Sequence, residues 1–322
     1  MASRHSMVAA RSFILVEVIM SIFSLSLILG GIMSGALLMS EILGYSEDVA
    51  AARDRADQVF SIMRLPLDYC GYGLPPDADG YKAGFAPGSG KPFNWDGAIS
   101  VIDAVVRIDD KRVVRKNGAC RIVYSIPTTI RVKRETTASA GSVELHADGV
   151  PPFLEEVDAW KKPNSVRNWV IFGAMLPDRH PMWLRSIDKS GHGAVLTLQY
   201  DAWRHGIDET LYIPENETLN YVGATDMNVR IGEANWAFYV EDLRGGGNQP
   251  KEDGVVDARF EIDETKRLLK VWLLVRGNRL YTEVKTSGRP KGWPSEYAAG
   301  LPEGSRHYRL FTYTETFLLK NF

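Results

Sequence analysis

The stretch that decides the fold covers residues 13–43 and reads FILVEVIMSIFSLSLILGGIMSGALLMSEIL. Residues 18–40 carry no charged side chain, and a helix of that length rises about 35 Å. The hydrocarbon core of a bilayer is about 30 Å thick, so this helix is long enough to span it. Arg4 and Arg11 precede the stretch and acidic residues follow it. The positive-inside bias therefore places the N-terminus in the cytoplasm and the remaining chain outside it.

The composition of the whole chain is that of an ordinary globular protein. Of 322 residues, 45% are hydrophobic and 24% charged, which excludes a disordered or fibrous chain. The 38 Lys and Arg residues are balanced by 40 Asp and Glu residues, so the basic excess typical of nucleic-acid-binding proteins is missing. Two cysteines are too few for a disulfide-dense scaffold or a zinc site of four cysteines.

Two simpler interpretations of the apolar stretch compete with the one developed below. A secretory signal peptide has a shorter apolar core, followed by small residues at the cleavage site. Here the run is longer, and Gly44-Tyr45-Ser46 fits such a site poorly. A plain membrane anchor fits the length but leaves Glu17 unexplained, unless its carboxylate lies among the lipid headgroups beside Arg11.

The order of features at the start of the chain indicates a third interpretation. A short basic leader (residues 1–12) ends in Ser12, Phe13 follows, and Glu17 is the fifth residue of the apolar helix. This pattern resembles the type III signal of type IV prepilins and pseudopilins. The resemblance implies that a prepilin peptidase cuts between Ser12 and Phe13 on the cytoplasmic side and methylates the new N-terminal Phe13. The family usually has Gly before the cut, so we expect Ser12 to slow processing without preventing it.

Physical chemistry gives Glu17 a role that agrees with this resemblance. Where apolar helices pack together, a buried carboxylate needs a cation to offset its desolvation. The free amino group of Phe13 in a neighbouring subunit is the natural candidate, and the pairing would set the register between subunits. Gly31 and Gly35 form a G-x-x-x-G pattern, which either lets helices approach closely or reflects simple tolerance of glycine in a membrane helix.

The helix is expected to continue beyond the membrane as an amphipathic stalk over residues 44–65. Its apolar residues recur at spacings of three and four, as one face of a helix requires; they are Val49, Ala52, Ala56, Val59, Phe60 and Met63. Pro66 lacks a backbone donor and disfavours helix at the residue before it, so the helix should end near Arg64. From residue 13 to 64 a continuous helix would be about 78 Å long.

Residues 66–97 are rich in Gly, Pro and Asp, so we predict a long loop. Two fragments of known motifs lie in it. Gly88-Ser-Gly-Lys91 is similar to part of a phosphate-binding loop, but Phe85 and Pro92 replace residues that such a loop needs. Asp77-Ala-Asp-Gly80 is part of a calcium loop that lacks the later ligands. We expect neither a nucleotide nor a calcium ion here.

Residues 98–322 show the pattern of a β-rich head. β-Branched and aromatic runs lie between turn signals, which include Lys116-Asn-Gly118, Gly277-Asn278 and Gly245-Gly-Gly247. The expected strands are 99–108, 120–132, 169–175, 194–200, 236–240, 258–262, 268–275, 280–286 and 308–319. We predict an α+β fold in which the long N-terminal helix packs on an antiparallel sheet.

Both ends of the head resemble one branch of the pilin family. The segments are 69–75 (YCGYGLP), 268–277 (LLKVWLLVRG) and 307–316 (HYRLFTYTET). They look like those of W-type minor pilins and J-type pseudopilins of type II secretion. That resemblance implies a pilin-like fold and a non-catalytic subunit without cofactors. It also implies that the subunit sits at or near a filament tip and starts assembly with other minor pilins or pseudopilins, the major pilin and an inner-membrane platform.

Few residues point to other chemistry. Cys70 and Cys120 would both lie outside the cytoplasm, where an even count favours a disulfide, although two buried thiols are the alternative. The six histidines have no metal-ligand spacing. Basic residues at 111–116 and 131–134 could form a strip for DNA, but alternating charges on exposed strands are the commoner cause.

Two rival functions stay open. The subunit could be a tip adhesin or DNA-binding module, with residues 135–250 as the binding surface. It could also be a membrane-anchored extracytoplasmic enzyme, which would need a catalytic cluster that the sequence does not reveal. Substitution of Glu17 separates an assembly subunit from an anchored enzyme.

Overall fold

The computed structural model describes residues 3–74, 97–108, 111–138, 141–149, 169–172, 182–190, 193–200, 211–231, 236–243, 247–297 and 301–321, with side chains from Val16 onward. The chain divides into two compact units, Met1–Ala51 and Ala52–Phe322, and we call the second unit the head. One long helix and an antiparallel, sheet-rich head make this an α+β protein, as predicted.

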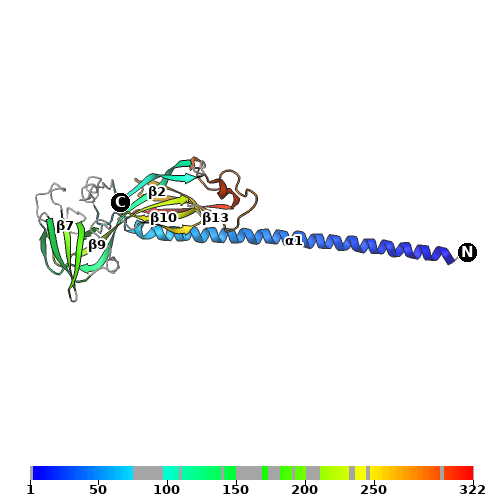
Figure 1. The fold of residues 1–322 in the computed structure, drawn as a ribbon, viewed down its shortest axis with the longest axis horizontal. Coiled ribbons are helices and arrows are strands. Elements are labelled where there is room, and N and C mark those ends of the chain that lie inside the picture. Colours follow the sequence, from blue (N-terminus) through cyan, green and yellow to red (C-terminus); the bar gives the residue numbers. More distant parts are fainter. Residues whose placement is uncertain are drawn as a thin grey trace. The chain divides into compact units, whose positions relative to one another are not determined.

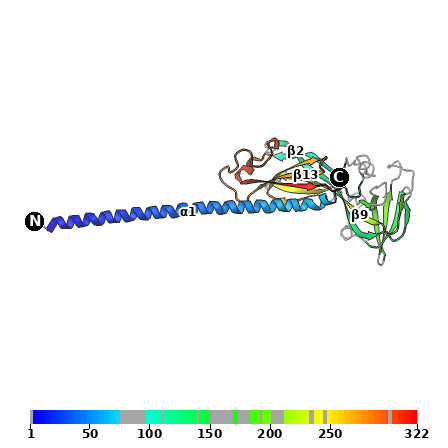
Figure 2. The same cartoon turned by 180° about the vertical axis from the view of Figure 1, so that it is seen from behind.

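Helix α1 runs from Ser3 to Asp68, and its last part belongs to the core of the head (Figures 1 and 2). Five residues of the predicted apolar stripe are buried, namely Ala52, Ala56, Val59, Phe60 and Met63, whereas the sixth, Val49, is half-buried. The five buried residues share a hydrophobic cluster with residues of the sheets, and the ring of Phe60 lies 6.2 Å from that of Phe317. Spacings of three and four place these side chains on one face, so the helix forms because that face is covered.

The helix ends four residues later than expected. Pro66 lies inside its last turn, and the helix continues to Asp68 rather than ending near Arg64. The side chain of Leu67 is only 2% exposed and joins the core cluster. Burial of Leu67 holds the last turn in helical form, and a proline this close to the C-terminus removes only one hydrogen bond.

The head contains three antiparallel sheets. The strands are β1 (Ile99–Ile108), β2 (Lys111–Arg131), β3 (Thr136–Ala138), β4 (Gly141–Ala147), β5 (Trp169–Phe172), β6 (Met182–Ser190), β7 (Gly193–Tyr200), β8 (Leu211–Ile213), β9 (Thr218–Ile231), β10 (Trp236–Asp242), β11 (Gly247–Asp253), β12 (Val255–Asp263), β13 (Leu268–Arg276) and β14 (Leu310–Leu318). The largest sheet has the order β1-β2-β9-β5-β6-β7-β4, and β10 and β11 extend it from β9. A second sheet is β12-β13-β14, and β3 pairs with β8.

Strand β9 links the two ends of the large sheet. One of its edges pairs with β2, while β5 and β10 pair in succession with the other edge. Its first residues, Leu219 and Tyr221, belong to a hydrophobic cluster drawn from residues 130–221. Its later residues, such as Met227 and Val229, belong to the cluster that covers α1. These two clusters of the head are therefore separate cores that share one strand.

The sheet β12-β13-β14 is covered on both faces. Leu269, Val271 and Leu273 of β13 face the cluster that contains α1. Trp272 and Leu274 belong to a third cluster, with Trp293 and Tyr297 from the chain after β13. This alternation explains the nearly continuous apolar run LLKVWLLV, because strands buried on both faces have no polar side.

Eight of the nine predicted strands correspond to strands of the structure, with β1 matching its expected range at both ends. The prediction for 280–286 was wrong: this segment is coil, and Leu280 and Val284 are 65% and 52% exposed. The expected turn at Asn117 lies inside β2, where Asn117 adopts a φ of 54° and the register with β1 shifts. A bulge that places residues 116–118 opposite Asp103 therefore replaces the turn. Among the described residues, the only helices besides α1 are the 3₁₀ turns Ser295–Tyr297 and Glu303–His307.

Candidate functional site

The first half of α1 is the most distinctive surface of the chain. By length and composition, α1 is the one described helix that is long and apolar enough to cross a membrane. Its large hydrophobic side chains between Val16 and Tyr45 are 48% to 69% exposed. The Ser26 hydroxyl donates to the Ile22 carbonyl at 2.8 Å, so it needs no partner outside the helix. This surface can be covered by lipid or by other apolar helices.

The predicted processing site lies at the start of this helix. Ser12 and Phe13 have helical backbone, and their side chains lie outside the described ones. Glu17 is exposed and is the only charged residue between Arg11 and Glu41. Positions 13 and 17 are one turn apart on the same face of a helix. An amino group created at Phe13 and the carboxylate of Glu17 would therefore lie on one side of α1.

The predicted packing glycines also lie on an open part of the helix. A Cβ atom added at Gly31 or Gly35 would meet no atom within 4 Å, and the same holds for Gly30. Residues four apart share a helix face, so Gly31 and Gly35 leave a shallow strip between larger side chains. Such a strip lets a second helix approach closely.

Polar contacts fix the second half of α1 in the head. Arg55 donates to the Arg276 carbonyl at 2.7 Å and lies 3.9 Å from the Glu252 carboxylate. Burial raises the pKa of Glu252, and Arg55 partly opposes this shift. Near the other end, Arg64 pairs with Glu315 and Asp68 with Lys320, at 3.1 and 3.0 Å. Both ends of this helical stretch are thus tied to the rest of the head.

Cys70 and Cys120 are free thiols in the structure, so the disulfide that their even number favoured is not formed. Both are buried in the cluster that covers α1. The Cys70 thiol donates to the Ala98 carbonyl at 3.5 Å. Burial raises its pKa to about 12, and burial together with Cys70 and Asp226 raises that of Cys120. Both side chains are protonated and behave as small core residues.

The motif after α1 lies against the C-terminal end of the described head. Gly71 has a φ of +70°, and a Cβ there would lie 2.6 Å from the Asn321 carbonyl oxygen. The glycine is needed both for this backbone conformation and for the close approach of the C-terminal segment. Tyr308 lies just before β14. Its ring packs edge-on against Trp236, and its ring centroid lies 4.5 Å from the Arg276 guanidinium carbon.

The structure corrects the proposed basic strip. Arg115 is 2% exposed, so it cannot contribute to a surface for DNA. Its guanidinium lies 3.0 Å from Asp257, and Arg259 binds the other oxygen of the same carboxylate at 2.8 Å. Burial lowers the pKa of Arg115; Asp257 opposes this shift and Arg259 adds to it. We call Arg115, Asp257 and Arg259 the buried ion cluster. Asp257 and Arg259 alternate with apolar residues along β12 just as Glu261 and Asp263 do, so the sequence alone did not show that the first two are buried.

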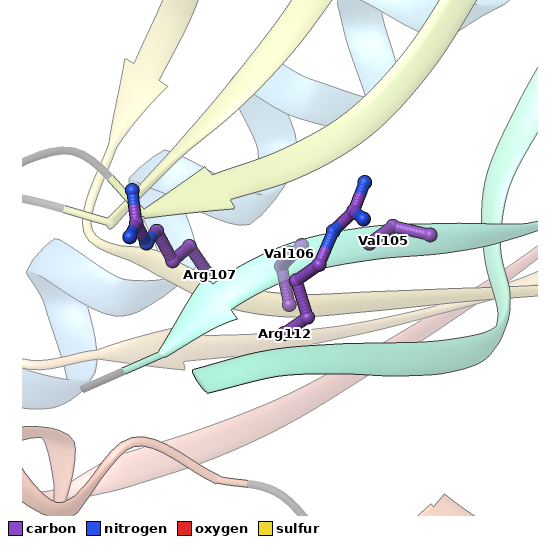
Figure 3. Close-up of a pocket in the computed structure, with 4 residues that line it drawn as sticks. All are labelled: Val105, Val106, Arg107 and Arg112. Carbon is purple, nitrogen blue, oxygen red and sulfur yellow. The ribbon is translucent and has the colours of Figure 1, made fainter. Parts of the chain in front are cut away.

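A hollow of about 610 Å³ lies where β1 ends and β2 begins. It is lined by Val105, Val106, Arg107 and Arg112, and Figure 3 shows both guanidinium groups on the same side of the hairpin. Arg107 faces Arg112 across the two strands. The described lining residues provide positive charge and apolar surface. Such a surface is better suited to binding an anion than to catalysing a reaction.

Within the part of the chain that the structure describes, no group of three His, Cys, Asp or Glu side chains could hold a metal ion. The fragments Gly88–Lys91 and Asp77–Gly80 lie outside the described residues, as do His180, His192 and His205. The chain matches no model of a known protein family, no curated protein and no solved structure.

Proposed function

We propose that the protein is a non-catalytic minor pilin or pseudopilin that helps to start assembly of a type IV pilus or a type II secretion pseudopilus, at or near its tip. One observation carries the proposal: a single helix exposes apolar side chains along its first half and buries its second half in a β-rich head. The first half suits a membrane before assembly and a bundle of like helices after it. Because the second half is packed in the core of the head, the head would move together with the helix when the subunit is assembled.

Glu17 is the residue on which this function would depend. An isolated carboxylate among packed apolar helices is costly unless a cation pairs with it. Cleavage after Ser12 would create that cation at Phe13 of the neighbouring subunit. The proposed partners are therefore a prepilin peptidase, other pilin-like subunits that use the same helix, and an inner-membrane platform that moves them.

Substitution of Glu17 tests this role. Glu17→Ala should lower incorporation into sheared filaments or pseudopili by at least about ten-fold, because one partner of a buried pair is lost. Glu41→Ala is the matched control, since Glu41 lies at the other end of the same apolar run. Quantitative mass spectrometry of filament and membrane fractions provides the measurement. Equal incorporation of both variants would contradict an assembly role, and an extracytoplasmic activity that survives Glu17→Ala would favour the anchored enzyme.

A second candidate is the display of an adhesive or DNA-binding lobe at the tip. It is favoured by the separate hydrophobic cluster drawn from residues 130–221, which does not include α1. Val132 and Glu217 are joined by a backbone hydrogen bond of 3.0 Å, so a two-residue Asn-Gly turn could replace residues 134–215. In this deletion variant, Cys70 and Cys120 should stay unreactive towards thiol reagents if the rest of the head still folds. Loss of adhesion or of DNA retention by such a folded variant would support this candidate. Unchanged binding would exclude it.

A further inference from the structure

The coil after β13 combines exposed apolar residues with positive charge. Residues 277–292, which we call the basic loop, contain Arg279, Lys285, Arg289 and Lys291 but only one acid, Glu283. The whole chain has a net charge of −2, so this short segment departs clearly from the average. A surface that concentrates one sign of charge attracts partners of the opposite sign.

Two large aliphatic side chains project from the basic loop. Leu280 is 65% exposed and Val284 is 52% exposed. Between them lies Tyr281, whose ring centroid is 5.4 Å from Arg279, 5.0 Å from Lys285 and 4.9 Å from Arg309. Aliphatic side chains, a tyrosine and long cationic side chains are the residue types that occupy the interface between lipid tails and water.

The basic loop lies beside the first helical residues of the head. Arg55, near the first helical residues of the head, donates to the Arg276 carbonyl and to the Asn278 side chain, at 2.7 and 2.5 Å. The opposite end of the same helical stretch, at Asp68, contacts Lys320 instead. Figures 1 and 2 show the loop as a brown coil at one end of the head.

We propose that the basic loop docks on anionic lipid headgroups, with Leu280 and Val284 inserted at the interface and Arg279, Lys285 and Arg309 beside the phosphates. The inference rests on the membrane anchoring that is part of the proposed function. Residues 44–51 separate the apolar segment from the head, and a helix of that length rises only about 12 Å. Docking would hold the head on the membrane before the subunit is extracted into a filament.

A lipid surface fits this patch better than an acidic protein does. The aliphatic residues stand on an exposed coil with basic residues around them, which matches a layered surface of tails and phosphates. The chain also carries its own membrane segment, so the headgroups are already concentrated near the loop. Each exposed Lys or Arg near an anionic membrane strengthens binding about five-fold.

The test uses the full chain in proteoliposomes and an environment-sensitive fluorophore on Leu280→Cys. Cys70 and Cys120 are buried, so the new cysteine is labelled selectively. In vesicles of phosphatidylglycerol and phosphatidylcholine, emission at position 280 should shift to the blue and be quenched by spin-labelled lipid. Leu318→Cys is the matched control, because Leu318 is similarly exposed but lies at the Lys320 end of the head; its label should stay in water.

Charge variants complete the test. Arg279→Gln combined with Lys285→Gln should lower the docking equilibrium by at least about ten-fold, and so should vesicles of phosphatidylcholine alone. An aqueous signal at position 280 in anionic vesicles would overturn the inference, and so would equal docking on neutral vesicles. A label on Leu37→Cys reports anchoring itself. If position 37 is in lipid and position 280 is not, only this inference fails; if position 37 stays aqueous, the proposed anchoring fails too.

Discussion

The buried ion cluster is the least expected arrangement of single residues in the head. Among the described residues, Asp257 is the only carboxylate that binds Arg115 and Arg259, through its two different oxygens. The ring of Tyr297 lies 4.9 Å from the Arg259 guanidinium carbon. Two guanidinium groups around one carboxylate leave positive charge in the interior, so stability depends strongly on that carboxylate.

Asp257→Asn should therefore lower the free energy of unfolding by about 3–5 kcal/mol, because both arginines lose their counter-charge while they stay buried. Denaturant unfolding of the detergent-solubilised chain, followed by tryptophan fluorescence, measures this change. Asp263→Asn is the control: it lies on the same strand, but its ion pair with Lys266 is at the surface. Equal unfolding midpoints for the two variants would show that the cluster contributes little.

The buried Cys70 thiol leads to a prediction about how the stability of the head depends on pH. Burial raises the pKa of Cys70 from 9.0 to about 12, so the folded chain keeps a proton that the unfolded chain loses. The contribution of Cys70 to stability is complete below pH 9 and is lost as the pH rises towards 12. At about one pH unit above the ordinary thiol pKa, Cys70 should account for a loss of roughly 1 kcal/mol in the free energy of unfolding.

Unfolding curves across this pH range, for the natural chain and for Cys70→Ala, isolate this effect from that of other groups. The variant is less stable at neutral pH, but its stability should fall less steeply above pH 9. Parallel pH profiles would mean that Cys70 is ionised or accessible in the folded state. A disulfide with Cys120 would also abolish the difference, and a reductant distinguishes that case.

At the scale of elements, the second half of α1 packs into the core of the head through one of its faces only. Leu67 is 2% exposed and Leu65 is 53% exposed, although both lie in the last turns of the helix. Leu67→Ala should lower the free energy of unfolding by about 3 kcal/mol, and Leu65→Ala by less than about 0.5 kcal/mol. Denaturant unfolding measures both. Similar losses would contradict the orientation of α1 against the sheets.

This face could be predicted because a helix repeats its pattern within a few residues. The spacing of Ala52, Ala56, Val59 and Phe60 is visible in the sequence without knowledge of what covers it. The end of the helix could not be predicted in the same way. Pro66 indicates a break locally, and only the burial of Leu67 in the tertiary core explains why the helix continues.

The central strand β9 escaped sequence reasoning for a physical reason. Asn220, Asp226 and Asn228 interrupt its apolar pattern, yet all three are buried. Asp226 is stabilised by Arg121 at 3.2 Å, a partner 105 residues away that no local pattern reveals. Conversely, segment 280–286 has the alternation of a strand but stays coil, because Leu280 and Val284 find no core to cover them.

Arg115, in the candidate basic strip, also shows that a local sequence pattern does not reveal which side chains are buried. Lys111, Arg112 and Lys116 surround it in the sequence and indicate a basic strip. Neighbouring residues of a strand point to opposite faces, so Arg115 enters the core while Arg112 stays exposed. The local charge pattern was visible in the sequence, but the assignment of faces depended on the bulge at Asn117.

At the scale of the whole molecule, the chain combines one unusual helix with a head in which the two larger of three described hydrophobic clusters share strand β9. The first core includes the end of α1 and residues of two of the three motifs that resemble those of pilin-like proteins, at 69–75 and 268–277, and Phe311 and Tyr313 of the third pack against it. The second core is made of residues 130–221 and coincides with much of the stretch for which we found no resemblance. Assembly is thus the proposed role of the first part, and any binding specificity would belong to the second.

Processing of the N-terminus tests this account most directly. The intact mass of the membrane-extracted protein should be measured after expression with and without a prepilin peptidase. The account predicts loss of residues 1–12 and gain of one methyl group on Phe13, only when the peptidase is present, and faster processing of Ser12→Gly. A chain that stays uncut even as Ser12→Gly would indicate a permanent anchor, and a cut beyond residue 40 would indicate an ordinary secreted protein; either mass would contradict the proposed function.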